Sequence, residues 1–98
     1  MLGPMVIKHE HVVLSDTTPV QIPFDDGDQV RYSVSFRVQN IDESAVVYIG
    51  GVGVTSSSYG IKLEPSDVMS FDEMPRYPGL YAISNTDGSI LATLRMSK

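Results

Sequence analysis

Apolar and polar residues alternate strictly over residues 30–39, VRYSVSFRVQ. Successive side chains of a β-strand point to opposite faces, so this pattern predicts a strand with one buried face and one face in water. The expected buried side chains are Val30, Tyr32, Val34, Phe36 and Val38. The preceding residues 25–28, DDGD, are typical of a turn, because Asp bonds its own backbone and Gly accepts a positive φ.

Other short runs suit strands of different kinds. Residues 6–14 are rich in β-branched side chains. Residues 18–24, TPVQIPF, carry Pro19 and Pro23, which confine this run to an edge or a short extended segment. Residues 45–50, AVVYIG, are apolar on both faces, as expected of a central or doubly covered strand. The runs GIKLEP and LYAIS add two further short strands, of which the first ends at Pro65.

The last part of the chain holds one ambiguous run and one clear one. Residues 67–73, DVMSFDE, fit a strand or a single helical turn capped by Ser66, and the strand agrees better with its neighbours. Residues 89–96, SILATLRM, alternate again after a turn at residues 85–88. One face of this run carries Ile90, Ala92, Leu94 and Met96, and the other carries Leu91, Thr93 and Arg95.

Seven or eight short strands with a turn every eight to twelve residues predict an all-β fold, a single antiparallel β-sandwich or small barrel. The 98 residues suffice for one domain spanning residues 1–98. Within it, residues 1–16 are expected to form either an extended N-terminal arm or an edge strand.

The composition of the chain limits the kinds of partner that we expect it to bind. The net charge is −5 and the seven Lys and Arg residues are scattered, so a basic surface for nucleic acid is not expected. The longest charge-free stretch, residues 44–61, is too rich in Gly and Ser to span a bilayer, and the N-terminus lacks the pattern of a signal peptide. With charged residues at only 19%, part of the surface must be uncharged and suited to association.

The chain has no cysteine, which excludes disulfides, thiolate metal sites and a thiol nucleophile. A secreted domain of this size often carries disulfides. Folding in a reducing cytoplasm, or stabilisation by partners, is therefore expected.

The glycine-rich residues 48–60, YIGGVGVTSSSYG, invite comparison with a phosphate-binding loop. Such loops need a Lys and a Ser or Thr directly after the last glycine, or a third glycine that opens a helix. Here the next lysine is Lys62 and no helix is predicted. We expect Gly50 and Gly51 to let a buried strand bend or end, and the following residues to form an uncharged loop.

Candidate chemistry elsewhere is sparse. His9 and His11 lie two apart, so both rings fall on one side of a strand, but a metal needs a third ligand, and two solvated histidines are the better interpretation. DDGD lacks the ligand spacing of a calcium loop, and no nucleophile motif accompanies the Ser-rich segment. We expect no catalytic residues, no cofactor and no metal, hence no enzyme; an enzyme or metal domain built on His9 and His11 is the third alternative.

The remaining candidates are contact residues in loops. Five tyrosines occur in a chain without tryptophan, and Tyr59 and Tyr77 fall in expected loops. An aromatic side chain there either closes the end of the sandwich or anchors a contact. With the exposed apolar residues of the glycine-rich loop, the candidate interface consists of Val52, Val54, Tyr59 and Tyr77.

The order of motifs from residue 17 to residue 96 resembles a small β domain of tailed-bacteriophage virion proteins. The matching segments are TTPVQIP, VVYIGG, VGVTSSSYGIKLEPSD, LYAIS and SILATLRM. Two features depart from the pattern: Ser66 stands where a glycine is expected after Pro65, which suggests another turn type, and DEMPRYPG looks like an insertion.

The resemblance implies a structural virion protein, most specifically a capsid decoration (cement) protein that stabilises the shell of major capsid protein through non-covalent contacts. It implies a major capsid protein or another virion protein as partner, a homo-oligomer such as a trimer, in which residues 1–14 reach a neighbour, and location on the virion after synthesis in the host cytoplasm. The alternative is a tail, collar or fibre-associated module that binds a host-surface glycan.

Overall fold

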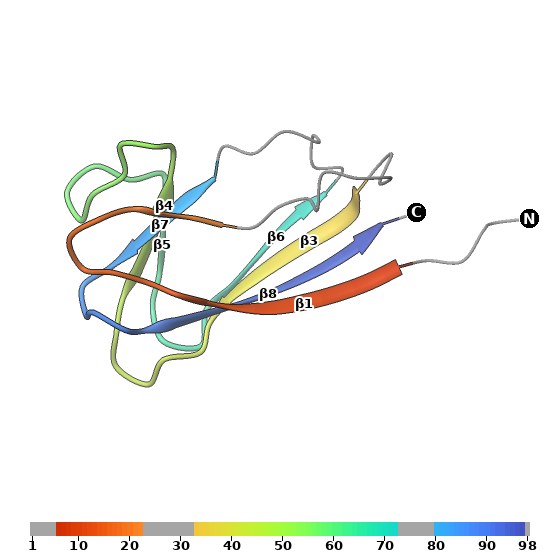
Figure 1. Ribbon diagram of the computed structural model, residues 1–98, viewed down its shortest axis with the longest axis horizontal. Coiled ribbons are helices and arrows are strands. Elements are labelled where there is room, and N and C mark those ends of the chain that lie inside the picture. The colour runs from red at the N-terminus through yellow and green to blue at the C-terminus, as the bar shows by residue number, and fades with distance from the viewer. Residues whose placement is uncertain (1–5, 23–32, 73–79, 98) are drawn as a thin grey trace, which may run out of the picture.

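Two four-stranded antiparallel sheets form a β-sandwich in the computed structural model, which describes residues 6–22, 33–72 and 80–97 (Figure 1). The first sheet has the order β1-β8-β3-β6 and the second β2-β7-β4-β5. The eight strands are β1 (Val6–Val13), β2 (Val20–Gln21), β3 (Ser33–Asn40), β4 (Val47–Gly50), β5 (Ile61–Leu63), β6 (Val68–Asp72), β7 (Tyr81–Ser84) and β8 (Ile90–Ser97). The all-β prediction is confirmed, and the two sheets make the fold a sandwich.

Hydrophobic alternation located most strands correctly. In β3, Phe36 and Val38 are buried while Arg37 is exposed, as the pattern predicts. The run DVMSFDE contains β6, so the strand interpretation is confirmed over the capped helical turn. The turn predicted at DDGD, the first residues of the 30–39 run and Tyr32 lie outside the described residues.

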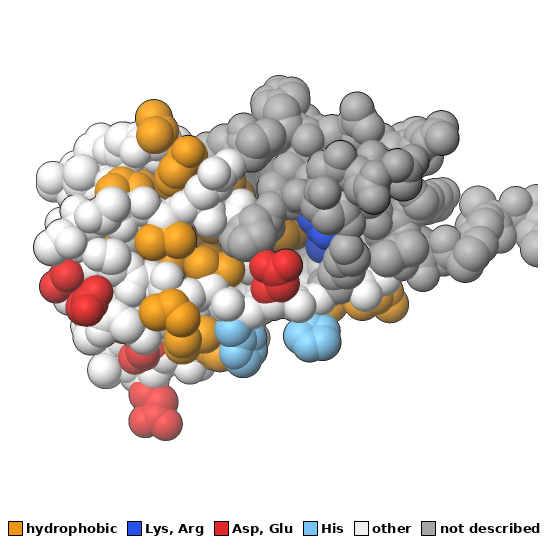
Figure 2. Space-filling model, viewed as in Figure 1, with side chains coloured by type: hydrophobic (Ala, Val, Ile, Leu, Met, Phe, Trp, Pro, Cys, Tyr) orange, Lys and Arg blue, Asp and Glu red, His pale blue; other side chains and the backbone are white. Residues whose placement is uncertain are grey.

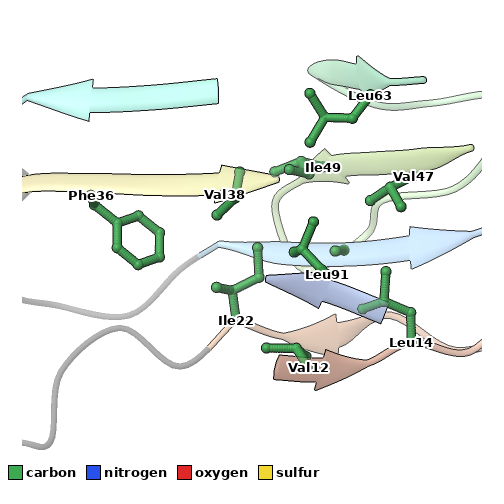
Figure 3. Packing of buried hydrophobic residues seen from close by; sticks show 10 residues of the cluster. Val12, Leu14, Ile22, Phe36, Val38, Val47, Ile49, Leu63 and Leu91 are labelled. Atoms are coloured by element: carbon green, nitrogen blue, oxygen red, sulfur yellow. The ribbon is translucent and has the colours of Figure 1, made fainter. Parts of the chain in front are cut away.

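Consecutive described strands mostly belong to different sheets, with β4 and β5 as neighbours in one sheet. Each crossing carries apolar side chains into the space between the layers (Figure 3). The buried cluster draws on both sheets and on the connections, and it comprises Val12, Leu14, Ile22, Phe36, Val38, Val47, Ile49, Leu63, Ala82 and Leu91.

The faces of β8 are opposite to what hydrophobicity alone suggests. Leu91, Thr93 and Arg95 are buried, at 0%, 6% and 8% exposure. The more apolar set, which includes Leu94, lies on the outside of the first sheet. The cause is the pairing with β3: Phe36 faces inward and is directly opposite Arg95, and cross-strand partners share a face of the sheet.

The turn between β5 and β6 keeps the backbone of a glycine turn although serine occupies the glycine position. Asp67 N donates to Glu64 O at 2.9 Å, Pro65 occupies the second position, and Ser66 has φ 76°. A positive φ at the third position defines a type II turn. The expectation of another turn type was wrong, because Ser66 adopts the left-handed conformation that its N–H bond to Asn40 O (2.8 Å) and the neighbouring strands impose.

Candidate interaction surfaces

The loop that joins β4 to β5, residues 51–60, is built around one buried valine. Val54 is 2% exposed, and its N–H donates to Gly51 O at 3.1 Å. A Cβ added to Gly50 would lie 3.2 Å from Val54 Cγ2 and 3.4 Å from Gly60 N. Gly50 therefore ends the strand without a side chain because Val54 packs against its backbone.

The rest of this loop is a small, uncharged turn that is followed by an aromatic side chain, Tyr59. Thr55 and Ser58 exchange backbone hydrogen bonds of 2.8 and 3.2 Å. The ring of Tyr59 lies 4.9 Å from that of Tyr48 at an interplanar angle of 47°. Beside Tyr59 the loop is hollowed by a shallow, open depression with a volume of about 290 Å³, lined by Gly50, Gly51, Gly53, Val54, Ser58, Tyr59 and Gly60.

The four residues predicted as an interface fall in different environments. Val52 is 72% exposed at the loop tip and Tyr59 is 45% exposed. Val54, expected at the surface, is buried, because the turn closed by its N–H bond to Gly51 O sets its side chain against Gly50; it supports the loop and is not available to a partner. Tyr77 lies outside the described residues.

A larger apolar surface, which the sequence did not reveal, is the outside of the first sheet. Its exposed hydrophobic side chains are Ile7 (61%), Val13 (60%), Val68 (52%) and Leu94 (38%). The registers place these residues on one face of the sheet, because cross-strand partners share a face. His9 is opposite Leu94, Leu94 is opposite Arg37, and Val13 is opposite Ile90. We call this surface the outer face: Ile7, His9, His11, Val13, Arg37, Gln39, Val68, Ser70, Ile90, Ala92, Leu94 and Met96.

Charge is scarce on the outer face. Among its described side chains, Arg37 is the permanently charged one, and His9 and His11 are exposed. Figure 2 shows the histidines beside hydrophobic side chains along the β1 side of the molecule. An antiparallel sheet with a solvated face normally alternates to polar residues there, so this face is suited to contact with a partner.

No metal or membrane feature emerges in the described part of the chain. Within residues 6–22, 33–72 and 80–97, no three His, Cys, Asp or Glu side chains gather to hold an ion. Those residues also contain no helix long and apolar enough to cross a bilayer.

One carboxylate has a shifted acidity. The backbone N–H groups of Ser44 and Ala45 donate to Asp42 Oδ1, each at 3.0 Å, and these bonds lower the pKa of Asp42 below its ordinary value. The carboxylate thereby organises the connection from β3 to β4, which is a structural role.

No protein-family model matches this chain, and no curated protein matches it. Solved structures do match, and one of them is described as "Bacillus endospore appendages form a novel family of disulfide-linked pili". The likeness has a TM-score of 0.47 at 17% sequence identity and covers 97% of this chain and 91% of the other.

Proposed function

We propose that this protein is a non-catalytic structural component that attaches to a larger assembly through the outer face of its first sheet. The observation that carries the proposal is the outward direction of the apolar side of β8. Leu94 and its neighbours on that strand lie outside, while Thr93 and Arg95 occupy the interior. Apolar side chains that water surrounds gain free energy when a partner covers them.

The composition of the outer face supports binding by many weak contacts. Ile7 and Val13 lie near opposite ends of β1 and Val68 begins β6, and each of the three is more than half exposed. Their separation spreads the contact across the sheet, and Arg37 together with the histidines adds polar groups for orientation. A broad, mostly neutral face suits non-covalent attachment, in which no chemical step is needed.

The order of motifs, which resembles that of phage virion proteins, suggests which larger assembly the protein attaches to. On this basis the protein is a decoration protein on the outside of a tailed-phage capsid, where it bridges copies of the major capsid protein. A protein that binds the assembled shell and not its separated subunits stabilises the shell by mass action. The net charge of −5 is compatible with a partner surface of protein and unfavourable for direct contact with packaged DNA.

The test is cosedimentation of the purified protein with phage capsids assembled without it. We expect saturable binding by the wild type, and loss of about tenfold or more in affinity for Leu94→Asp, since the substitution buries a charge in the contact. Val52→Asp is the matched control, because Val52 is still more exposed but lies in the loop. No binding by the wild type removes the decoration proposal; loss with Val52→Asp alone moves the contact to the loop.

A second candidate is the tail, collar or fibre-associated module that binds a glycan. Its specific support is Tyr59, whose half-exposed ring is held against Tyr48 beside the depression of the loop. A fixed aromatic face next to backbone polar groups is suited to stacking of a sugar ring. Tyr59→Ala should abolish binding to host cells and Tyr59→Phe should retain it. Equal binding by both variants excludes this function.

A further inference from the structure

Among the described strands, β1 is a long edge strand with a partner on one side. β1 pairs with β8 along its full length, from Val6 opposite Ser97 to Val13 opposite Ile90, with no register shift, and it ends the sheet on its other side. The other edge strands, β6, β2 and β5, have five, two and three residues, against eight for β1. No proline interrupts β1. Such an edge is a template for pairing with another chain.

The backbone groups that face the open edge follow from hydrogen bonds at the end of β1. Leu14 N donates to Ser89 O at 2.9 Å, and Leu14 O accepts from Gly88 N at 2.9 Å, so both groups of Leu14 point toward the β8 side. Along a strand these groups alternate in direction. Because the register with β8 is unbroken, the N–H and C=O groups of Ile7, His9 and His11 point to the open edge.

We propose that two copies of this chain pair antiparallel through their β1 edges, with the two-fold axis at His9. His9 then stands opposite His9 of the second copy and Ile7 opposite His11, and each of these pairs exchanges both backbone hydrogen bonds. Between them, Lys8 stands opposite Glu10 of the second copy, and Val6 opposite Val12. The result is one eight-stranded sheet across two copies.

Charge favours this register over the two registers beside it. Moving the axis by one residue to Glu10 sets Glu10 against itself, and moving it to Lys8 sets Lys8 against itself. Like charges directly opposite destabilise a strand pair, and opposite charges stabilise it. With the axis at His9, Lys8 meets Glu10 twice. These positions are the non-hydrogen-bonded pairs of the proposed ladder, whose Cα atoms lie closer together than those of the hydrogen-bonded pairs.

The same charges guard the edge against other partners. If β1 paired with an uncharged strand of another protein, Lys8 and Glu10 would have no opposite charge across the pair. Charged residues on natural edge strands discourage unspecific pairing in this way. The pairing also extends the outer face. Ile7, 61% exposed in one copy, gains a neighbour in the second copy on the same side of the sheet.

The experiment measures the molar mass by sedimentation velocity or light scattering at about 10–200 µM protein and pH 8. The wild type should be in equilibrium between monomer and dimer. Lys8→Glu and Glu10→Lys should each raise the dimer dissociation constant about tenfold or more, since each makes both cross-strand pairs like-charged. Glu43→Lys, an exposed loop residue with the same change of charge, should leave it unchanged.

Two further samples test the register itself. An equal mixture of the Lys8→Glu and Glu10→Lys chains should form a heterodimer, and the double variant with both substitutions should recover the homodimer. His9→Pro removes an edge-facing N–H that β8 does not use, so it should abolish dimers while circular dichroism stays that of the wild type.

A wild type that is monomeric over this range, a trimer, or a dimer indifferent to both single substitutions overturns the proposal. So does a double variant that fails to dimerise although it is folded. The pairing is independent of the proposed attachment, because it is measured without capsids. Leu94→Asp, which tests attachment, should leave the dimer intact.

Discussion

Asn40 is a buried amide that ties the two sheets together at one end of the sandwich. It is 0% exposed at the end of β3. Its Nδ2 donates to Ala45 O at 2.8 Å and to Leu63 O at 3.0 Å, and its Oδ1 accepts from Asp42 N at 3.0 Å. Leu63 belongs to β5 of the opposite sheet, so one side chain joins both layers and the loop between β3 and β4.

Asn40→Ala should remove all three bonds and leave the carbonyls of Ala45 and Leu63 without their donor. Ala45 and Leu63 are buried, at 0% and 3% exposure, so water does not readily replace the amide. An unsatisfied buried polar group costs about 1–3 kcal/mol. Two carbonyl groups lose their donor, whereas the N–H of the half-buried Asp42 can bond to water instead. We therefore expect the free energy of unfolding to fall by about 3 kcal/mol.

A loss of this size is measurable against the total. Small domains unfold with about 5–15 kcal/mol, and about 1 kcal/mol shifts the Tm of a domain of this size by roughly 4–8 °C. Urea unfolding followed by circular dichroism should show a lower midpoint at an unchanged m-value, and the Tm should fall by roughly 12–24 °C.

Two variants sharpen the test. Gln39→Ala removes one peripheral bond, from Nε2 to Ser66 O at 3.2 Å, and should cost no more than about 1 kcal/mol. Asn40→Asp keeps the acceptor but sets a carboxylate against two carbonyls, so it should destabilise at least as much as Asn40→Ala. The reasoning is refuted if Asn40→Ala costs less than about 1 kcal/mol or no more than Gln39→Ala.

Three further predictions concern turns. Ser66→Gly should raise the free energy of unfolding by about 0.5–1 kcal/mol in urea, because it relieves a left-handed φ of 76°; a decrease would mean that the serine is unstrained. Gly88→Ala should cost about 1 kcal/mol for its φ of +87°, whereas Gly53→Ala, equally open in space but outside the left-handed region, should stay within about 0.5 kcal/mol; equal losses would contradict this. Because folding lowers the pKa of Asp42, its carboxylate contributes to the free energy of unfolding above the ordinary value of 3.8, and this contribution is lost as the pH falls through the folded pKa. The difference in stability between the wild type and Asp42→Asn should therefore become smaller below about pH 4. A difference that does not depend on pH would refute the assignment.

Sequence patterns predicted what depends on local alternation. β3 was recognised because Phe36 and Val38 alternate with polar residues, and the spacing of such runs predicted an all-β sandwich or small barrel, of which the two sheets show the sandwich. The importance of Asn40 was missed although the signal was present. It occupies the next inward position after Val38, and a polar residue there calls for buried partners.

The predictions for the loops were wrong at positions where contacts with distant residues determine the conformation. Val54 was expected at the surface since it lies among glycines and serines, yet the absence of a side chain at Gly50 creates the space that it fills. Ser66 likewise adopts the left-handed φ of a glycine, because its N–H bonds Asn40 O and Asp67 N closes the turn. Neither contact is between residues that a short sequence window places together.

The outer face follows from the same kind of long-range constraint. The strong alternation of β3 fixes Phe36 inward, and the register then brings Arg95 of β8 inward with it. A slip of one residue would exchange the faces of β8 and bury Leu94 instead. The observed register therefore keeps apolar side chains of β8 outside, where they cost solubility unless something covers them. Pairing through the β1 edge would double this surface by joining two outer faces in one sheet, so a dimer would present a larger contact to any flat partner than the single chain does.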